Sequence, residues 1–241
     1  MFAVIFAIAL ANAYAAEIPS YINVCGRKNP NINQCILDNM NNLKDRICNG
    51  LTDLGLPPLE PLNIERLVIS DVSNNKIYIN DVQITGLCDF NIKSFKVDLD
   101  KLDFIIDISL NRIYLNGTYD INVHILVPLV HKAPIYLTSD NVGVKIHLLA
   151  ETANKGDKKH MYVSEMKTNV HITRYEAKYG FNENDLSQLG QILGGLIGSN
   201  QEEFIQRLVP TLEEEVSKWL INIFNSLFKM FSYDELFPDR E

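Results

Sequence analysis

The sequence predicts an α+β fold in which one long C-terminal helix is wrapped by a highly curved antiparallel β-sheet. Three observations support this: a long middle region where apolar and polar residues alternate, the lack of a helical pattern within it, and a C-terminal stretch whose apolar residues recur every three or four positions. Alternation indicates strands with one buried face, and that face needs an apolar partner. Rolling the sheet around the helix buries both surfaces.

The first residues have the pattern of a secretory signal peptide. Residues 1–11 are apolar and uncharged, and Ala13-Tyr14-Ala15 is a small-x-small cleavage pattern. We expect residues 1–15 to be removed and residues 16–241 to form a single secreted, extracellular domain. The apolar core is too short to span a bilayer. The alternative interpretation is a buried N-terminal helix.

Composition and charge exclude several classes of partner. The chain is 46% hydrophobic and 22% charged, with a net charge of −8, which is typical of a globular protein and unfavourable for nucleic acid or anionic membranes. No later segment is apolar for the length of a membrane span, so we expect no stable membrane insertion. The secretory route permits disulfides among Cys25, Cys35, Cys48 and Cys88. Four cysteines allow three full pairings, among which the sequence does not choose, and their spacing matches no zinc pattern.

The chain begins with a helical segment and an extended connector. Ile36, Met40, Leu43 and Ile47 share one face of a helix, and glycines at 50 and 55 end it. Residues 56–62 contain three prolines and cannot lie inside a helix.

Period-two alternation then runs from residue 64 to about residue 175. The clearest strands are 121–127 and 142–148, and turn residues at 71–75, 116–117, 139–141 and 154–157 divide the region into an antiparallel meander. The N-glycosylation sequon at Asn116 falls on one of these turns, so we expect it in an exposed loop.

The C-terminal helix extends from Glu202 to Phe231, about 45 Å at a rise of about 1.5 Å per residue. Its apolar stripe is wide, and Pro210 is expected to kink the helix or separate its first turns. Glu213-Glu214-Glu215 spread around the helix in steps of about 100°, which predicts a solvated face rather than a carboxylate site.

Motifs for catalysis are missing from the sequence. There is no Gly-x-Ser-x-Gly elbow, and the glycine-rich stretch at 194–199 lacks the lysine of a phosphate loop. The histidines have no metal-ligand spacing. We therefore predict no enzymatic activity, no metal and no cofactor.

Several motifs resemble the takeout and juvenile-hormone-binding protein family of insects. They are Cys25 with Asn33-x-Cys35-Ile36, the Gly55-Leu56-Pro57-Pro58-Leu59-Glu60-Pro61-Leu62 connector, Leu115-Asn116-Gly117-Thr118-Tyr119, and Asp234-Glu235-Leu236-Phe237-Pro238 after the long helix. The resemblance implies a TULIP-like super-roll with an internal apolar tunnel for a terpenoid, fatty acid or related lipid. It also implies a Cys25–Cys35 disulfide, whereas Cys48 and Cys88 are left as a second bridge, as partners of other thiols or as buried thiols.

The functional hypothesis is a secreted carrier of one small hydrophobic ligand. The predicted lining residues come from the strands and from the helix: Ile121, Val123, Ile125, Val127, Tyr136, Val144, Ile146, Leu148, Leu212, Val216, Leu220 and Ile223. Tyr119, Tyr136, His147 and Tyr175 are candidates for orienting a polar head group. Alternatives are a signalling or odour- and feeding-related protein that acts through its surface on an unidentified receptor, a membrane lipid-transfer protein, and a secreted hydrolase.

Overall fold

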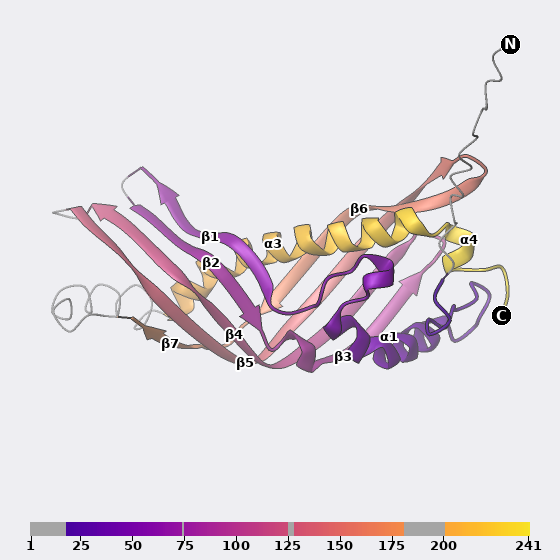
Figure 1. Cartoon of the computed structure of the whole chain (residues 1–241), viewed down its shortest axis with the longest axis horizontal. Helices are drawn as coiled ribbons and strands as arrows, with labels where there is room; N and C mark the ends of the chain where they lie inside the picture. The colour runs from indigo at the N-terminus through magenta and orange to yellow at the C-terminus, as the bar shows by residue number, and fades with distance from the viewer. Residues whose placement is uncertain (1–17, 74, 125–127, 181–200) are drawn as a thin grey trace, which may run out of the picture.

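The computed structural model of the chain describes residues 18–73, 75–124, 128–180 and 201–241. The expected signal peptide, the lining candidates Ile125 and Val127, and the glycine-rich stretch lie outside the described residues. Figure 1 shows a long, strongly curved sheet with helix α3 lying along its concave side, which is the predicted architecture.

Within the described residues, one antiparallel sheet contains seven strands. They are β1 (Leu62–Val72), β2 (Asn75–Thr85), β3 (Phe90–Asp98), β4 (Asp103–His124), β5 (Pro128–Lys155), β6 (Lys158–His171) and β7 (Glu176–Tyr179). The order is β1-β2-β4-β5-β6, with β3 on β4 and β7 on β5. The sheet is antiparallel, as predicted, and β1–β2 and β3 to β6 pair with the next strand in the chain; in the described residues β3 is not paired with β2, and β7 returns to β5, so the meander is not continuous.

The β4–β5 ribbon runs the length of the sheet. One half of β4 pairs with β3 and the other half with β2, while β5 pairs with β6 at one end and with β7 at the other. The predicted turns at 116–117 and 139–141 are therefore wrong, since both lie inside these two strands. Gly117 is required by close strand packing, because a Cβ there would lie 2.7 Å from the Ile79 side chain.

The alternation of buried and exposed residues shifts by one residue in β4 and, at the positions paired with it, in β5. We call this place the paired kink. The buried residues are even-numbered from Phe104 to Leu110 and odd-numbered from Leu115 onward, and β5 changes correspondingly between Leu137 and Val142. The pairing register stays constant across this change. Each strand has two consecutive exposed residues there, 111–112 and 140–141, and Asn141 has a φ of 56°.

Charge and close packing hold the kink. The Arg112 guanidinium donates two hydrogen bonds to the Asp140 carboxylate, one of them 3.0 Å long, and this partner lowers the pKa of Asp140. Gly86 approaches from the end of β2 with a φ of 88°, and a Cβ there would lie 2.1 Å from the Arg112 carbonyl oxygen. Only glycine fits this backbone conformation and this contact.

The helices lie at the ends and on the open side of the sheet. They are α1 (Ile32–Asn49), α3 (Gln201–Met230), α4 (Tyr233–Leu236), and the short 3-10 turns η1 (Thr52–Leu54) and η2 (Leu87–Asp89). Pro210 lies inside α3 without splitting it. Helix α3 contacts β6 and β1, the two strands at the ends of the sheet order, so it closes the open side of a half-barrel. Among the described helices, none has the length and apolar character of a membrane span.

Candidate ligand-binding interior

The described residues form two large apolar clusters, one on each side of the kink, and a third, smaller cluster of Leu51, Leu54 and Phe231 against which Ile18 and Tyr21 pack. The hairpin-end cluster consists of buried residues of β1, β2, β4 from 115 to 123 and β5 from 133 to 137, together with Tyr175, Phe204, Leu208 and Leu212. The C-terminal cluster consists of Phe95, Phe104, Ile106, Ile146, Leu148, Ala150, Met161 and Phe228. Helix α3 contributes to both, so it links the two halves of the interior.

The hairpin-end cluster contains a polar pair. Tyr119 is 1% exposed, and its hydroxyl oxygen lies 2.8 Å from Nδ1 of His131, a half-buried side chain of β5. The rings also stack, with centroids 5.5 Å apart and planes 25° from parallel. A buried hydroxyl without a partner costs about 1–3 kcal/mol. The pair thus places hydrogen-bonding atoms within an apolar surrounding at little cost to the fold.

An aromatic contact borders the same cluster. Tyr175, in the segment between β6 and β7, packs on Phe204 of α3 with ring centroids 5.3 Å apart, and both are buried. Tyr119 and Tyr175 are therefore the two head-group candidates that the fold places in the interior.

The other two head-group candidates face away from the interior. His147 Nε2 lies 2.8 Å from an Asp103 carboxylate oxygen, on the face opposite the buried Ile146 and Leu148. Tyr136 is 49% exposed, between the buried Ile135 and Leu137. The prediction that Tyr136 lines the interior is corrected, because odd-numbered residues of β5 are the buried ones on this side of the kink.

The remaining predicted lining residues divide between the clusters. Ile121, Val123, Leu212 and Val216 belong to the hairpin-end cluster or pack against it. Val144, Ile146, Leu148 and Leu220 belong to or pack against the C-terminal cluster, and Ile223 is half-buried. The strand and helix residues predicted to line one cavity are thus separated along the molecule by the paired kink.

Polar side chains of α3 cover the edge of β6. Glu213 accepts a hydrogen bond of 2.7 Å from the Val170 amide, and Asn225 accepts one of 2.8 Å from the Val163 amide. On the other side, the Thr211 hydroxyl donates to the Val68 carbonyl of β1 at 2.8 Å. Edge strands present unpaired backbone groups that need partners. Glu213 is thus a structural contact rather than part of a solvated face, whereas Glu214 and Glu215 pair with Lys218 as surface residues.

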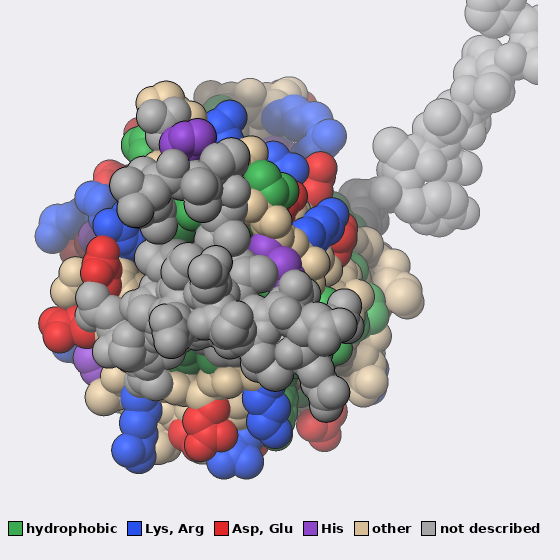
Figure 2. All heavy atoms as spheres, turned by 90° about the vertical axis from the view of Figure 1, so that its left-hand side faces the viewer, with side chains coloured by type: hydrophobic (Ala, Val, Ile, Leu, Met, Phe, Trp, Pro, Cys, Tyr) green, Lys and Arg blue, Asp and Glu red, His purple; other side chains and the backbone are tan. Residues whose placement is uncertain are grey.

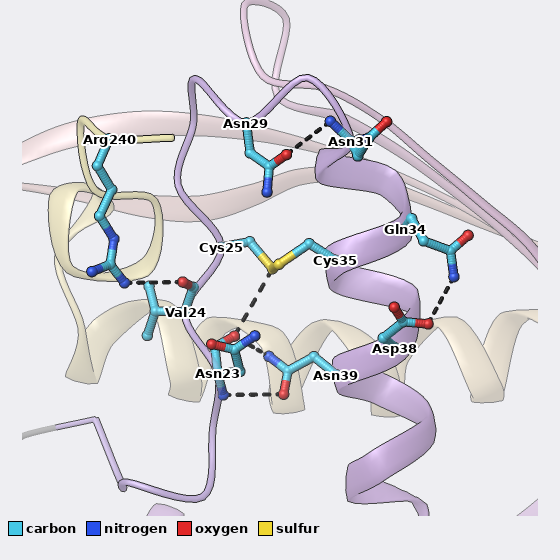
Figure 3. The surroundings of a disulfide bond; sticks show 10 residues. All are labelled: Asn23, Val24, Cys25, Asn29, Asn31, Gln34, Cys35, Asp38, Asn39 and Arg240. Atoms are coloured by element: carbon cyan, nitrogen blue, oxygen red, sulfur yellow. Dashed lines mark hydrogen bonds between the residues drawn. A yellow bond between two sulfur atoms is a disulfide. The ribbon is translucent and has the colours of Figure 1, made fainter.

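The N-terminal strap, residues 18–31, closes the end beside the C-terminal cluster. The predicted Cys25–Cys35 disulfide ties this strap to α1, and Figure 3 shows it between α1 and Arg240 of the C-terminal tail. Arg240 donates to the Val24 carbonyl at 3.2 Å, and Arg27 pairs with Asp234 at 2.7 Å. The second disulfide joins Cys48 at the end of α1 to Cys88 in η2. Of the possibilities that the sequence left open for these two cysteines, the structure thus has the second bridge.

The Asp-Glu-Leu-Phe-Pro motif forms the other part of this closure. Ser232 and Glu235 form a capping box at the start of α4, and Lys158 from the β5–β6 hairpin lies 2.6 Å from Glu235. Leu236 and Phe237 pack against the C-terminal cluster, where the ring of Phe237 lies 6.2 Å from that of Phe104. The acidic residues therefore fix α4 while the apolar ones cover the cluster.

A cleft of about 450 Å³ lies where the two clusters meet. Val170 on one side packs against the hairpin-end cluster, and Ile108 and Val144 pack against the C-terminal cluster. Other lining residues are Asp107, Gly143, Lys145, Asn169, His171 and Glu213. Among the described residues, no group of three histidine, cysteine or acidic side chains is arranged to hold a metal.

Comparison with known proteins identifies the family. The family model for haemolymph juvenile hormone binding protein matches residues 1–238. The chain belongs to this family. A search of curated proteins found no match.

Two solved structures are similar to this chain, one of them closely enough to show the fold. The crystal structure of Epiphyas postvittana Takeout 1 has a TM-score of 0.71 and 16% identity, and the match covers 89% of this chain and 99% of that one. Lipopolysaccharide binding protein matches with a TM-score of 0.36 and 12% identity over 78% of this chain and 38% of that one. The takeout match establishes the TULIP-like fold: a curled antiparallel sheet closed by a C-terminal helix.

The sequence reasoning missed His131 as the partner of Tyr119. A signal was present, because His131, Ala133, Ile135 and Leu137 alternate as one face of a strand. It also missed the edge contacts of Glu213 and Asn225, which depend on how α3 lies against β6.

Proposed function

We propose that the protein is a secreted carrier that holds one small hydrophobic molecule in its apolar interior and performs no chemistry on it. The ligand class is a juvenile-hormone-like terpenoid, a fatty acid or a related lipid. The family supports hydrophobic-ligand binding, and the two disulfides fit an oxidising, extracellular compartment.

The observation that carries the proposal is the Tyr119–His131 pair within the hairpin-end cluster. Its surroundings include the predicted lining residues Ile121, Val123, Leu212 and Val216. Apolar burial contributes about 25 cal/mol per Å², so a ligand burying about 300 Å² gains about 7 kcal/mol before the cost of association. The polar pair then orients a carboxyl, ester or epoxide oxygen.

The described residues at this end of the molecule expose charges of both signs (Figure 2). In Figure 2, which faces the hairpin end, basic and acidic side chains are interspersed around the periphery. The support for a hydrophobic ligand therefore comes from the apolar interior and not from the charges of the described surface.

The test uses protein secreted from insect cells and extracted with organic solvent. Recovered lipid is identified by mass spectrometry, and the extracted protein is titrated with palmitic acid and with a terpenoid ester. Tyr119→Phe removes one hydrogen bond, worth about 1 kcal/mol, and should weaken binding about fivefold.

Tyr162→Phe is the matched control, because the Tyr162 hydroxyl donates to Glu151 at the surface; its affinity should equal that of the wild type. The carrier hypothesis fails if no lipid is recovered and neither probe binds. The role of the polar pair fails if Tyr119→Phe and Tyr162→Phe have the same affinity.

A further inference from the structure

An asparagine on the outer face of the β4–β5 ribbon lies between two exposed aromatic rings. Asn116 is directly opposite Tyr136 in the β4–β5 pairing, and Tyr114 precedes it by two residues in β4. Tyr114 is 42% exposed and Tyr136 is 49% exposed, although both side chains are large and belong to interior strands of the sheet. They form a small aromatic patch on the convex surface.

Strand geometry brings these side chains within reach of one another. Directly opposed residues of antiparallel strands have Cβ atoms about 4.5–5.5 Å apart. Residues i and i−2 of one strand share a face and are separated by about 7 Å. A group attached to the Asn116 side-chain amide therefore projects between a ring across the ladder and a ring along the strand.

Asn116-Gly117-Thr118 is also an N-glycosylation sequon, located within a strand rather than in the expected loop. Alternation places Thr118 on the same outer face as Asn116. Asn116 is exposed, while the neighbouring Leu115 faces the interior with 6% exposure. A sugar on Asn116 thus extends away from the ligand-binding interior.

We propose that Asn116 carries an N-linked glycan whose first sugar lies against the rings of Tyr136 and Tyr114. The inference rests on the proposed secretion. The Asn116 amide nitrogen attacks C1 of an N-acetylglucosamine on a lipid-linked diphosphate oligosaccharide. The N–C1 bond forms, the C1–O bond to phosphate breaks, and the amide loses one proton as the lipid diphosphate leaves.

The chemistry of the patch suits a sugar. One face of N-acetylglucosamine presents C–H groups, and an aromatic face carries partial negative charge that attracts them. The acetyl methyl group adds apolar contact. Covering two exposed rings removes apolar surface from water, so the attached sugar stabilises the folded sheet as well as making it more soluble.

The experiment compares the melting temperatures of three forms of the secreted protein: fully glycosylated, trimmed by an endoglycosidase to a single sugar, and deglycosylated completely. All are extracted free of lipid first, so the result is independent of ligand binding. The first sugar should raise the melting temperature by about 2–4 °C, and trimming the outer sugars should not reduce this gain.

Substitutions of the tyrosines test whether their rings cause the gain in melting temperature. Tyr136→Val keeps a strand-favouring side chain but removes the ring, and should abolish most of the gain. Tyr136→Phe should retain it. Tyr162→Val is the matched control, since Tyr162 is 40% exposed but lies in β6, away from Asn116, and its gain should equal that of the wild type.

Ring-current shifts give an independent readout. Protons of the first sugar should move upfield in the wild type and return toward solvent values in Tyr136→Val. The inference is overturned if the secreted protein carries no glycan at Asn116, or if the gain is the same in Tyr136→Val and Tyr162→Val. Either result leaves carrier function untouched, because lipid recovery and probe binding measure it separately.

Discussion

Glu235 connects the C-terminal turn to the sheet, and neutralising it should destabilise the protein in a pH-dependent way. Lys158 lies 2.6 Å from one carboxylate oxygen. The Ser232 amide and hydroxyl both donate to the other oxygen at 2.7 Å. These partners, Lys158 first and Ser232 second, lower the pKa of Glu235 to about 2 from an ordinary value of 4.5.

The magnitude follows from this pKa. The full shift corresponds to about 3 kcal/mol of preference for the charged form. The Glu235 side chain is 35% exposed, and solvent screening reduces the contribution to about 1–2 kcal/mol. Glu235→Gln should therefore lower the melting temperature by about 2–8 °C at pH 7.

The stabilisation by Glu235 should decrease as the pH falls. Because the folded-state pKa is lowered, the stabilisation is fully present above the unfolded pKa of 4.5 and is lost as pH falls toward 2. The difference between wild type and Glu235→Gln should shrink over this window. Glu214→Gln is the control, since Glu214 is 65% exposed in its pair with Lys218 and should change stability by less than about 0.5 kcal/mol. A difference that stays constant from pH 7 to pH 2.5 would refute the assigned electrostatics.

Two further substitutions test the kink and the covered edge. Gly86→Ala should destabilise the protein by more than about 2 kcal/mol, because the added Cβ clashes with backbone at a position that already has a positive φ. The control is Gly156→Ala, which has a φ of 62° and no atom within 4 Å, and should cost only about 1 kcal/mol. Equal losses of unfolding free energy in chemical denaturation would contradict the clash. Asn225→Ala leaves the Val163 amide without its partner and should cost about 1–3 kcal/mol of stability. The control is Asn222→Ala, at an exposed position of the same helix. Faster hydrogen exchange of the Val163 amide in Asn225→Ala, but not in Asn222→Ala, identifies the lost hydrogen bond as the cause.

The sequence predicted the elements well because their periodicity follows directly from burial. Each long strand has one buried face, and the helical stripe matches the α3 residues that contact the interior. The two turns placed by composition alone were wrong. Gly117 allows close packing against Ile79 while Asn116 lies on the exposed face, and residues 139–141 form a kink without leaving the ladder.

The lining was harder to predict because alternation gives the face of a residue but not its position along a paired strand. Ile121 is opposite His131, whereas Val144 is opposite Ile108. These rows lie on either side of the kink, and only the β4–β5 register shows it. Tyr136 illustrates the same limit: its chemistry suited a ligand, but the phase of β5 turns it outward beside Asn116.

The division of the interior also constrains the size of the ligand. Phe204 and Phe228 lie at opposite ends of α3, one in each cluster, and 24 residues of helix separate them by about 36 Å. A fatty acid or a small terpenoid is much shorter than this distance. A ligand of that class bound beside Tyr119 therefore reaches only part of the interior, although the clusters come within one helical turn of each other where Val216 and Leu220 pack against different ones. A lipid that reaches from Phe204 to Phe228 would have to span about 36 Å, so the chain length of the recovered lipid reports how much of the interior the ligand occupies.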